Sequence, residues 1–287
     1  MSNFCKNKIK NTGICLKHKH FAEILETKPK IPWLEVHTEN FFNLNSNASR
    51  YLEKIREVYP ISLHSVGMSL GSASGVDYDH LGKIKATIER FEPELISDHL
   101  SWNTASDKNS TIHLPDLLPI PYTKEALNIL VENIEKTQDF LDREIMIENP
   151  SSYLAFKECD YTEWDFLVEA ANQSGCKILL DVNNIYVSAF NHNFSAEEYL
   201  THIPTKLVNE MHLAGYCINE IEGEQVYIDD HGAKIYDEVW SLYEKAIEKF
   251  GQVPTLVEWD TNVPELSVLL EEAAKADKII AEVNRRD

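Results

Sequence analysis

Short apolar runs alternate with longer amphipathic stretches along the whole chain. The runs are rich in β-branched and other apolar residues and are bounded by turn-forming residues, so they are predicted to be strands. There are eight of them: Gly13–Lys17, Trp33–His37, Ile61–Ser65, Leu95–Leu100, Glu144–Asn149, Lys177–Asn183, Leu207–Ala214 and Pro254–Glu258. The stretch from Thr123 to Leu141 places Leu127, Leu130, Ile134 and Leu141 on one helical face. Further helices are expected at Tyr161–Ser174, Ile235–Phe250 and Val263–Val283.

Polar residues and glycines mark the predicted helix ends. Asp77, Thr123 and Ser195 stand where N-caps are expected, and Gly175 and Gly251 fall where helices must stop before a new strand. A strand followed by a helix, repeated eight times, predicts an α/β fold: a (β/α)8 TIM-type barrel, xylose-isomerase-like, in a single domain over residues 1–287. The alternative is a doubly wound open sheet, but the sequence has no G-x-G-x-x-G or P-loop motif.

Two longer segments interrupt this alternation. Thr104–Pro121 is predicted to be a loop after the fourth strand, and Cys217–Lys234 follows the seventh strand. The second segment contains Asp229, Asp230 and His231. Because the loops that follow the strands build the active-site face of such barrels, both segments are expected near the functional site.

Charge and cysteine content narrow the classes of function. The chain has 27 Lys and Arg against 47 Asp and Glu, a formal net charge of −20, which argues against a nucleic-acid partner. The five cysteines are odd in number, widely spaced and without a C-x-x-C pair, so neither a disulfide framework nor a thiolate zinc site is expected. Met1–Lys10 has no apolar signal core, and no apolar run approaches the roughly 20 residues of a membrane span. A cytoplasmic protein without membrane partners is therefore expected.

Side chains of the kinds that bind metals recur at the predicted strand ends. They are Glu35, His37 and Glu39; His64; Asp98 and His99; Glu148 and Asn149; Asp181, Asn183 and Asn184; His212; and Glu258 and Asp260, with Asp229 and His231 in the later loop. A closed parallel barrel would bring these positions to one mouth. Crowded carboxylates are costly to bury unless cations neutralise them, and mixed imidazole and carboxylate ligands suit iron, zinc or manganese.

Local geometry selects among these residues. Residues at i and i+2 of an extended chain point the same way, so Asp229 and His231 are expected to bind one ion, and Asp181 and Asn183 to share a face. Asp98 and His99 should point to opposite sides, and we expect His99 to be the ligand. We expect the remaining histidines to face solvent: His18, His20, His80, His113, His192 and His202.

Each of these signals also has a structural explanation. A single strand-end histidine such as His64 is more often a structural residue than a ligand. Glu148 before Asn-Pro could cap a helix, and Asp181 before two asparagines could form a turn. Cys217 near His212 is a weak candidate nucleophile, and the nucleophile-elbow and zinc-protease motifs are absent. Recurrence on most strands is what favours a metal centre.

The segments that carry these residues resemble those of a known family, the multinuclear non-heme iron-dependent oxidative enzymes, which includes the iron subunit of methanobactin biosynthesis. The similar segments are EVHTENF from Glu35, HSVGMSLGS from His64, SDHLSW from Ser97, ENPSSY from Glu148, LDVNNIYV from Leu180, EMHLAG from Glu210, DDHG from Asp229 and VEWD from Val257. The resemblance runs from about Gly13 to Ile280. It implies a TIM-type barrel that holds two or three iron ions in mixed Fe(II) and Fe(III) states and uses O2 as co-substrate.

The resemblance also implies an activity and a set of site residues. The expected activity is oxidative modification of cysteine residues in a ribosomally made precursor peptide, with a separate leader-peptide-binding protein as a further expected partner. Metal ligation is implied for His64, His99, Glu148, Asp181, His212, Asp229, His231 and Glu258, and catalytic or supporting roles for Asn183 and Asp260. Two alternatives remain open: a zinc- or manganese-dependent hydrolase or isomerase on the same barrel, and a non-catalytic peptide-binding module.

Overall fold

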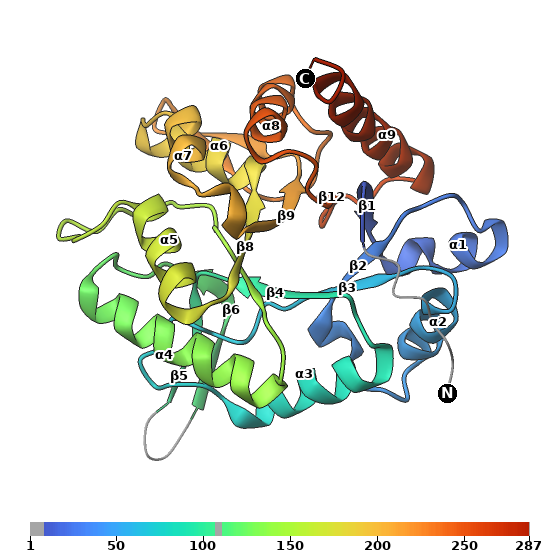
Figure 1. The fold of residues 1–287 in the computed structure, drawn as a ribbon, viewed down its shortest axis with the longest axis horizontal. Coiled ribbons are helices and arrows are strands. Elements are labelled where there is room, and N and C mark those ends of the chain that lie inside the picture. The colour runs from blue at the N-terminus through green and yellow to red at the C-terminus, as the bar shows by residue number, and fades with distance from the viewer. Residues whose placement is uncertain (1–8, 107–110, 287) are drawn as a thin grey trace.

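A closed barrel of eight parallel strands forms the centre of the molecule, as predicted (Figure 1). The structure is a computed structural model that describes residues 9–106 and 111–286. The barrel strands follow one another in the spatial order β1-β12-β9-β8-β7-β4-β3-β2, and β2 pairs with β1 to close the ring. Their bounds are β1 Thr12–Cys15, β2 Leu34–His37, β3 Ile61–His64, β4 Leu95–His99, β7 Met146–Glu148, β8 Lys177–Asp181, β9 Val208–Leu213 and β12 Thr255–Val257.

Helices surround this barrel (Figure 1). They are α1 Phe21–Thr27, α2 Asn47–Arg56, α3 Tyr78–Phe91, α4 Lys124–Leu141, α5 Glu163–Ser174, α6 Val182–His192, α7 Ala196–His202, α8 Asp237–Phe250 and α9 Leu266–Val283, with short 3-10 turns η1 His18–His20, η2 Thr38–Phe41 and η3 Thr205–Leu207. The predicted N-caps are confirmed, because Asp77, Thr123 and Ser195 each accept a hydrogen bond from a first-turn backbone amide. Gly175 and Gly251 end α5 and α8 with positive φ angles of 76° and 74°.

The hydrophobic core lies between the strands and the helices. The predicted stripe of α4 packs inward, and Leu127, Leu130, Ile134 and Leu141 are each at most 3% exposed. Burying such side chains supplies roughly 1.5–3 kcal/mol apiece, which holds the helices on the barrel. The strands are buried on both faces, as expected for a parallel sheet covered by helices. This packing fixes the strand ends where the polar residues lie.

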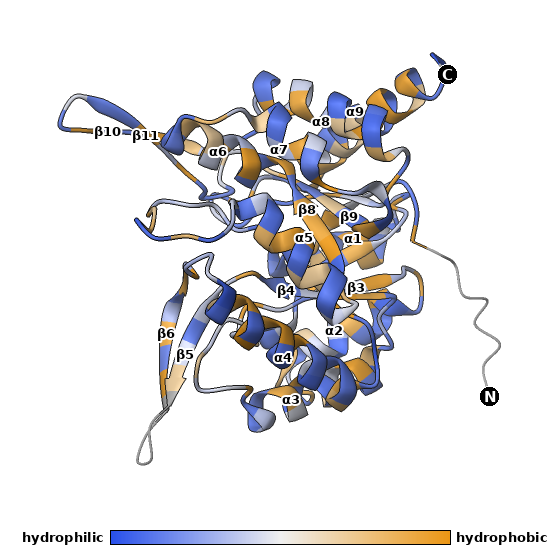
Figure 2. Ribbon diagram, turned by 60° about the vertical axis from the view of Figure 1, so that its left-hand side comes forward, coloured by the Kyte–Doolittle hydropathy of each residue, from blue (hydrophilic) through white to orange (hydrophobic). Residues whose placement is uncertain are grey.

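Two antiparallel hairpins extend from the barrel where loops were predicted. The expected loop Thr104–Pro121 contains most of a hairpin formed by β5 (Trp102–Ser106) and β6 (Thr111–Leu118). The segment Cys217–Lys234 begins with a second hairpin, β10 (Cys217–Ile221) and β11 (Glu224–Ile228). The loop prediction was wrong at both places. Figure 2 shows the two hairpins projecting from the same side of the molecule, as expected for excursions that follow strands β4 and β9.

One strand boundary also differs from the prediction. The sixth barrel strand ends at Asp181, and Val182 already begins helix α6, so Asn183 is helical and not extended. The predictions that concern Cys5 and the missing signal core in the first eight residues lie outside the described residues. Within the described part of the chain, no helix combines the length and apolar character that a membrane crossing requires.

Candidate metal centre

Strand register places the predicted ligands next to one another at the barrel mouth. His37 pairs in register with His64, His99 with Glu148, and Asp181 with His212. These residues stand at or near the carboxyl ends of β2, β3, β4, β7, β8 and β9. Parallel strands in a closed barrel direct their carboxyl ends to one face, which explains why residues far apart in sequence meet here.

His64, His99 and Glu148 form one compact group. The Nε2 atoms of the two histidines are 3.3 Å apart, and Glu148 Oε2 lies 3.2 Å from His64 Nε2 and 3.3 Å from His99 Nε2. Ser97 Oγ lies 2.7 Å from His64 Nδ1, so Nε2 is the nitrogen that faces the group. All three side chains are at least nine-tenths buried.

Asp98 supports this group from behind. Its Oδ2 accepts a hydrogen bond from the Met68 backbone N–H at 2.8 Å, and its Oδ1 accepts one from the His99 N–H at 2.6 Å. His99 therefore faces the mouth while Asp98 bonds to the backbone behind it, and ligation of a metal by His99 stays a prediction. Although burial opposes it, the carboxylates of Glu148 and Asp98 raise the pKa of His99 to about 9.

Asp181 and Glu148 face each other across β7 and β8. Asp181 Oδ1 caps helix α6 by accepting the Asn184 backbone N–H at 2.6 Å, whereas its Oδ2 has no hydrogen-bond partner among the described residues. Burial raises the pKa of Glu148 to about 7, and burial together with Glu148 raises the pKa of Asp181 well above its usual range. The cap and the free oxygen belong to one side chain, so the turn interpretation and the ligand interpretation of Asp181 are compatible.

A second group surrounds His231. Asp229 Oδ1 is 2.5 Å from His231 Nε2, while His231 Nδ1 lies 3.4 Å from Glu258 Oε2 and 3.3 Å from Asp260 Oδ2. Asn183 donates a hydrogen bond from Nδ2 to Asp229 Oδ1 at 2.8 Å, from the first turn of α6. Asp229 and His231 are thus side by side, as predicted. The expectation that Asn183 shares an extended face with Asp181 was wrong, because the helix begins directly after Asp181.

His212 connects the mouth with a deeper pair of carboxylates. Its Nδ1 lies 3.0 Å from Glu258 Oε2, and its Nε2 lies 3.1 Å from Glu35 Oε1 and 3.6 Å from Glu210 Oε1. Burial and the neighbouring Glu35 raise the pKa of Glu210 to about 8. Sequence reasoning missed Glu210, and it counted Glu35 among the metal-type side chains at the strand ends without including it in the predicted ligand set. The available signal was the spacing of Glu210 and His212, which puts both on one face of β9.

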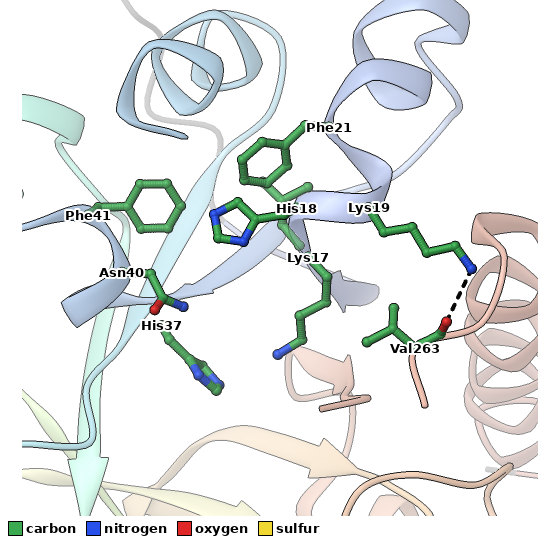
Figure 3. Close-up of a pocket in the computed structure, with 9 residues that line it drawn as sticks. Lys17, His18, Lys19, Phe21, His37, Asn40, Phe41 and Val263 are labelled. Atoms are coloured by element: carbon green, nitrogen blue, oxygen red, sulfur yellow. Dashed lines mark hydrogen bonds between the residues drawn. The ribbon is translucent and has the colours of Figure 1, made fainter. Parts of the chain in front are cut away.

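Lys17 and His37 border the mouth on the side of β1 and β2. Lys17 Nζ lies 2.5 Å from Asp260 Oδ1, and His37 Nε2 lies 3.5 Å from Glu258 Oε1. Figure 3 shows both side chains reaching into a cavity of about 260 Å³ that is also lined by Asn40. Although burial and Glu258 oppose it, hydrogen bonding from His231 lowers the pKa of Asp260 to about 2. Asp260 is therefore ionised and held between a lysine and a histidine.

The residues fit bound metal ions. Among the described residues, five sets of three side chains bring one ligand atom each to within 4.8 Å of one another: His64, His99 and Glu148; Glu148, Asp181 and His212; Asp181, His231 and Glu258; His37, Glu258 and Asp260; and Glu35, Glu210 and His212. Among the described residues, Asp181 Oδ2 is buried without a hydrogen bond, and Glu148 Oε2 meets the ring nitrogens of His64 and His99 without forming a well-aligned hydrogen bond. A buried carboxylate oxygen without a hydrogen bond is costly, and a cation would satisfy it. Nitrogen and carboxylate donors suit iron, zinc or manganese.

A cavity of about 350 Å³ opens above this cluster. We call it the metal cavity, and its lining includes His64, His99, Tyr153, His231, Glu258 and Asp260. Its volume falls in the range of pockets that hold small ligands or side chains. A substrate group that enters the metal cavity would therefore meet the candidate ligands directly.

The structure gathers all ten predicted site residues around this mouth. Asn183 and Asp260 contact ligand candidates through Asp229 and His231. Among the histidines expected to face solvent, His18, His113 and His202 do so. That expectation was wrong for His20, which is 1% exposed with Nε2 2.9 Å from Pro264 O, and for the half-buried His80 and His192. Their ring nitrogens bond to loop carbonyls or to Glu39, which sequence spacing does not reveal.

Comparison with known proteins identifies close relatives by sequence. A profile of the family described as "RiPP precursor modification enzyme MbnB/TglH/ChrH" matches residues 11–281. A UPF0276 protein of Vibrio parahaemolyticus is 44% identical over 271 residues, covering 94% of this chain and 93% of the relative. A UPF0276 protein of Caulobacter sp. strain K31 is 44% identical over 264 residues, covering 92% and 94%.

Solved structures with the same fold include sugar epimerases. A D-tagatose 3-epimerase-like protein superimposes with a TM-score of 0.61 at 13% identity, covering 96% of this chain and 99% of that one. D-psicose 3-epimerase from Clostridium cellulolyticum H10 gives a TM-score of 0.57, also at 13% identity, covering 96% and 99%. At this level of identity the likeness shows the xylose-isomerase-like barrel and nothing about substrate.

Proposed function

Because this chain belongs to the family of RiPP precursor modification enzymes, which act on ribosomally synthesised and post-translationally modified peptides, we propose that it is a multinuclear iron enzyme. In this proposal it uses O2 to modify cysteine residues of a precursor peptide oxidatively. The observation that carries the proposal is the convergence of buried imidazoles and carboxylates, several with unsatisfied oxygens, at the floor of one open cavity.

Two or three ions would share these ligands. His64, His99 and Glu148 would hold one ion, and Asp181, His231 and Glu258 another. Glu148 and His212 also belong to a set with Asp181, so they lie where neighbouring ions would meet. Asp229, whose Oδ1 lies beside His231 Nε2, would be a further ligand of the second ion. Bound iron would supply the redox chemistry and a site for thiolate binding, which lowers the pKa of a cysteine.

The remaining side chains orient the ligands. Asn183 holds Asp229 by a hydrogen bond of 2.8 Å, and Asp260 lies 3.3 Å from His231 Nδ1. Lys17 neutralises Asp260 from the other side. Such contacts to metal ligands fix their orientation, and their loss typically weakens metal affinity or activity by about 10–100-fold. We therefore assign Asn183 and Asp260 to positioning the ligands around His231.

The open cavity suits a peptide substrate more than a free small molecule. The metal cavity is bordered by the exposed Tyr153 and by residues of the strand β6, so an extended chain has access to it. A separate leader-binding protein remains part of the proposal, since the family resemblance implies such a partner. A reducing cytoplasm is the location in which the thiols of both enzyme and peptide would stay reduced.

The test is reconstitution of the metal-free protein with single metals. The substrate for the test is a short cysteine-bearing peptide sought among the genes beside this one, and any leader-binding protein encoded there is added to the reaction. After loading with Fe(II) under anaerobic conditions, admission of O2 should change the mass of the peptide at a cysteine. Loading with Zn(II) or Mn(II) should not. Full activity with zinc alone would refute the redox proposal and favour a hydrolase or isomerase.

A paired variant addresses the non-catalytic alternative. His99→Ala combined with Asp181→Ala removes one ligand from each of two proposed ion sites. We expect it to abolish peptide modification while the protein stays folded. Normal maturation of the peptide in cells by this variant would favour a peptide-binding module instead.

A further inference from the structure

A second cavity lies directly beside the metal cavity. It has a volume of about 190 Å³, and we call it the side pocket. Ser151 and Tyr153 line the metal cavity, whereas Ser152 and Leu154 line the side pocket, so one extended segment presents alternate side chains to the two. The end of β6 also separates the two cavities, since Leu117 of β6 lines the metal cavity and Ile120, just after β6, lines the side pocket.

The walls of the side pocket are apolar and largely aromatic. They include Ile120, Leu154, Phe156, Trp164 and Phe194. Leu154 is 66% exposed and Phe156 is 42% exposed, which is unusual for large apolar side chains next to an open pocket. The volume is below that of typical pockets for whole small-molecule ligands, roughly 300–1,000 Å³, and suits one long side chain.

One carboxyl group lies within this apolar surface. Glu163, at the start of α5, lines the pocket and is 9% exposed. The Tyr122 hydroxyl donates a hydrogen bond to Oε2 at 3.0 Å. The Tyr199 hydroxyl faces the same carboxyl group, but neither this hydroxyl nor Oε1 forms a well-aligned hydrogen bond among the described residues. Such a carboxyl group is costly to bury, and a donor or cation from a ligand would relieve the cost.

We propose that the side pocket binds a basic side chain, lysine or arginine, of the peptide whose cysteine enters the metal cavity. The aliphatic stem would lie against Leu154 and Ile120, as the stems of long cationic residues commonly pack on apolar surface. The cationic end would face the aromatic rings and pair with Glu163, so cation–π attraction and charge pairing act together. The negative charge of the whole chain, −20, favours the same ligand.

Burial supports this choice of ligand. It raises the pKa of Glu163 to about 7, because the loss of water around the carboxylate outweighs the hydrogen bonding from the Tyr122 and Tyr199 hydroxyls, which lowers the pKa. A bound ammonium or guanidinium group would stabilise the ionised form and restore its negative charge. The peptide assignment rests on the proposed function, whereas the chemistry of the pocket can be tested without metal or catalysis.

Cys159 provides a chemical handle for the test. Its thiol is exposed and lines the side pocket, whereas Cys15 and Cys176 are buried. The protein, with Cys5 and Cys217 replaced by serine, is equilibrated with an equimolar mixture of an amino-alkanethiol and the matching hydroxy-alkanethiol plus their disulfides. Chains of two, three and four carbons are compared, and intact-mass spectrometry gives the ratio of the two adducts.

The expected result is a preference for the amine that depends on Glu163. At the best chain length the amine-to-alcohol ratio should be about fivefold higher than in Glu163→Gln, equivalent to roughly 1 kcal/mol of pairing energy. The matched control is Glu158→Gln, which removes an exposed charge next to Cys159 and should leave the ratio within about twofold. Cys159→Ser should lose the adducts.

An unchanged ratio in Glu163→Gln at all chain lengths would overturn the proposal. So would an equal loss in Glu158→Gln, because the preference would then come from general surface charge. A competition experiment needs no change at Glu163. In the protein that retains Glu163, free n-butylamine should reduce formation of the amine adduct at Cys159 more strongly than free n-butanol does. Equal reduction by the two compounds would count against the proposal. Failure of iron-dependent activity would leave these results intact, so the two proposals fail separately.

Discussion

The Nε2 atoms of His64 and His99 lie 3.3 Å apart, on neighbouring strands β3 and β4. Glu148 Oε2 is almost equidistant from both, at 3.2 and 3.3 Å. Three ligands placed about 2.1 Å from a common ion have mutual separations close to these values. Burial and the nearby His99 and His212 lower the pKa of His64 well below its usual range, so His64 is neutral and its ring nitrogen is available for a metal.

Removing one histidine of this triangle should remove one ion. We expect His99→Ala, loaded anaerobically with Fe(II), to bind about one iron fewer per chain than the unsubstituted protein. Elemental analysis with parallel protein quantification measures this directly. The control His113→Ala removes an exposed histidine of β6 and should leave the iron content unchanged. An undiminished iron content in His99→Ala would show that this triangle does not bind iron.

Asp181→Asn should show that the buried charge of Asp181 destabilises the metal-free protein, although the same charge favours metal binding. Burial and Glu148 raise the pKa of Asp181, so in metal-free protein its ionisation opposes folding increasingly as pH rises. Asparagine keeps an oxygen that can accept the Asn184 N–H of the helix cap. The metal-free variant should therefore melt about 2–4 °C higher than the unsubstituted protein at pH 8, with a smaller gain at pH 5.

Metal should reverse this order. Added Fe(II) should raise the Tm of the unsubstituted protein and have less effect on Asp181→Asn, since ligand affinity for the native state is what stabilises it. Calorimetry with and without chelator provides both comparisons. A metal-free variant that melts lower at pH 8 would mean that Asp181 stabilises the protein as a carboxylate in its own right.

Much of this architecture could be predicted from sequence because two periodic signals coincide. Apolar strands alternate with helical stripes, and polar residues such as His64 and Asp181 stand at the carboxyl ends of the strands. Barrel closure then converts sequence order into a single mouth. The contact between Asp229 and His231 was predicted from the i, i+2 rule for an extended chain. The contact forms, but that reason was wrong, because His231 has a positive φ of 45° and is not extended.

The missed features depend on context that spacing does not contain. Strand β6 includes Pro115, and proline is excluded from central strands but tolerated in a two-stranded hairpin. Asn183 became helical because Asp181 caps the helix immediately after its strand. Glu210 was missed because its importance comes from Glu35, a neighbour on a distant strand that also faces His212.

Glu163 should make stability depend on pH well away from the metal centre. Burial raises its pKa from 4.5 to about 7 in the folded protein. The folded state therefore holds a proton that the unfolded state has released, and stability falls as pH rises from about 4.5 to about 7. The loss at higher pH is up to about 3 kcal/mol at 1.36 kcal/mol per pKa unit.

Chemical denaturation from pH 4.5 to pH 8 tests this effect. Glu163→Gln cannot ionise, so its free energy of unfolding should exceed that of the unsubstituted protein at pH 8 and approach it at pH 5. The difference in free energy of unfolding between the two proteins cancels the titration of other groups, provided that both proteins are free of metal. A difference that does not vary with pH would show that Glu163 has an ordinary pKa.

Gly215 should be intolerant of any side chain because of its contact with the segment that carries His231. A Cβ atom there would lie 2.3 Å from Ala233 O and 2.6 Å from Lys234 O, both backbone atoms that cannot rotate away. Gly215→Ala should therefore displace residues 229–234 and lower both stability and iron content, with a cost of about 1–3 kcal/mol from overpacking. The matched control for Gly215→Ala is Gly82→Ala in helix α3, where a Cβ has nothing within 4 Å. The Gly82→Ala change should stabilise the protein by about 0.5–1 kcal/mol, because alanine is more stable than glycine in a helix interior. Equal stability and equal iron binding in the two variants would mean that the Gly215 contact is not needed to place His231.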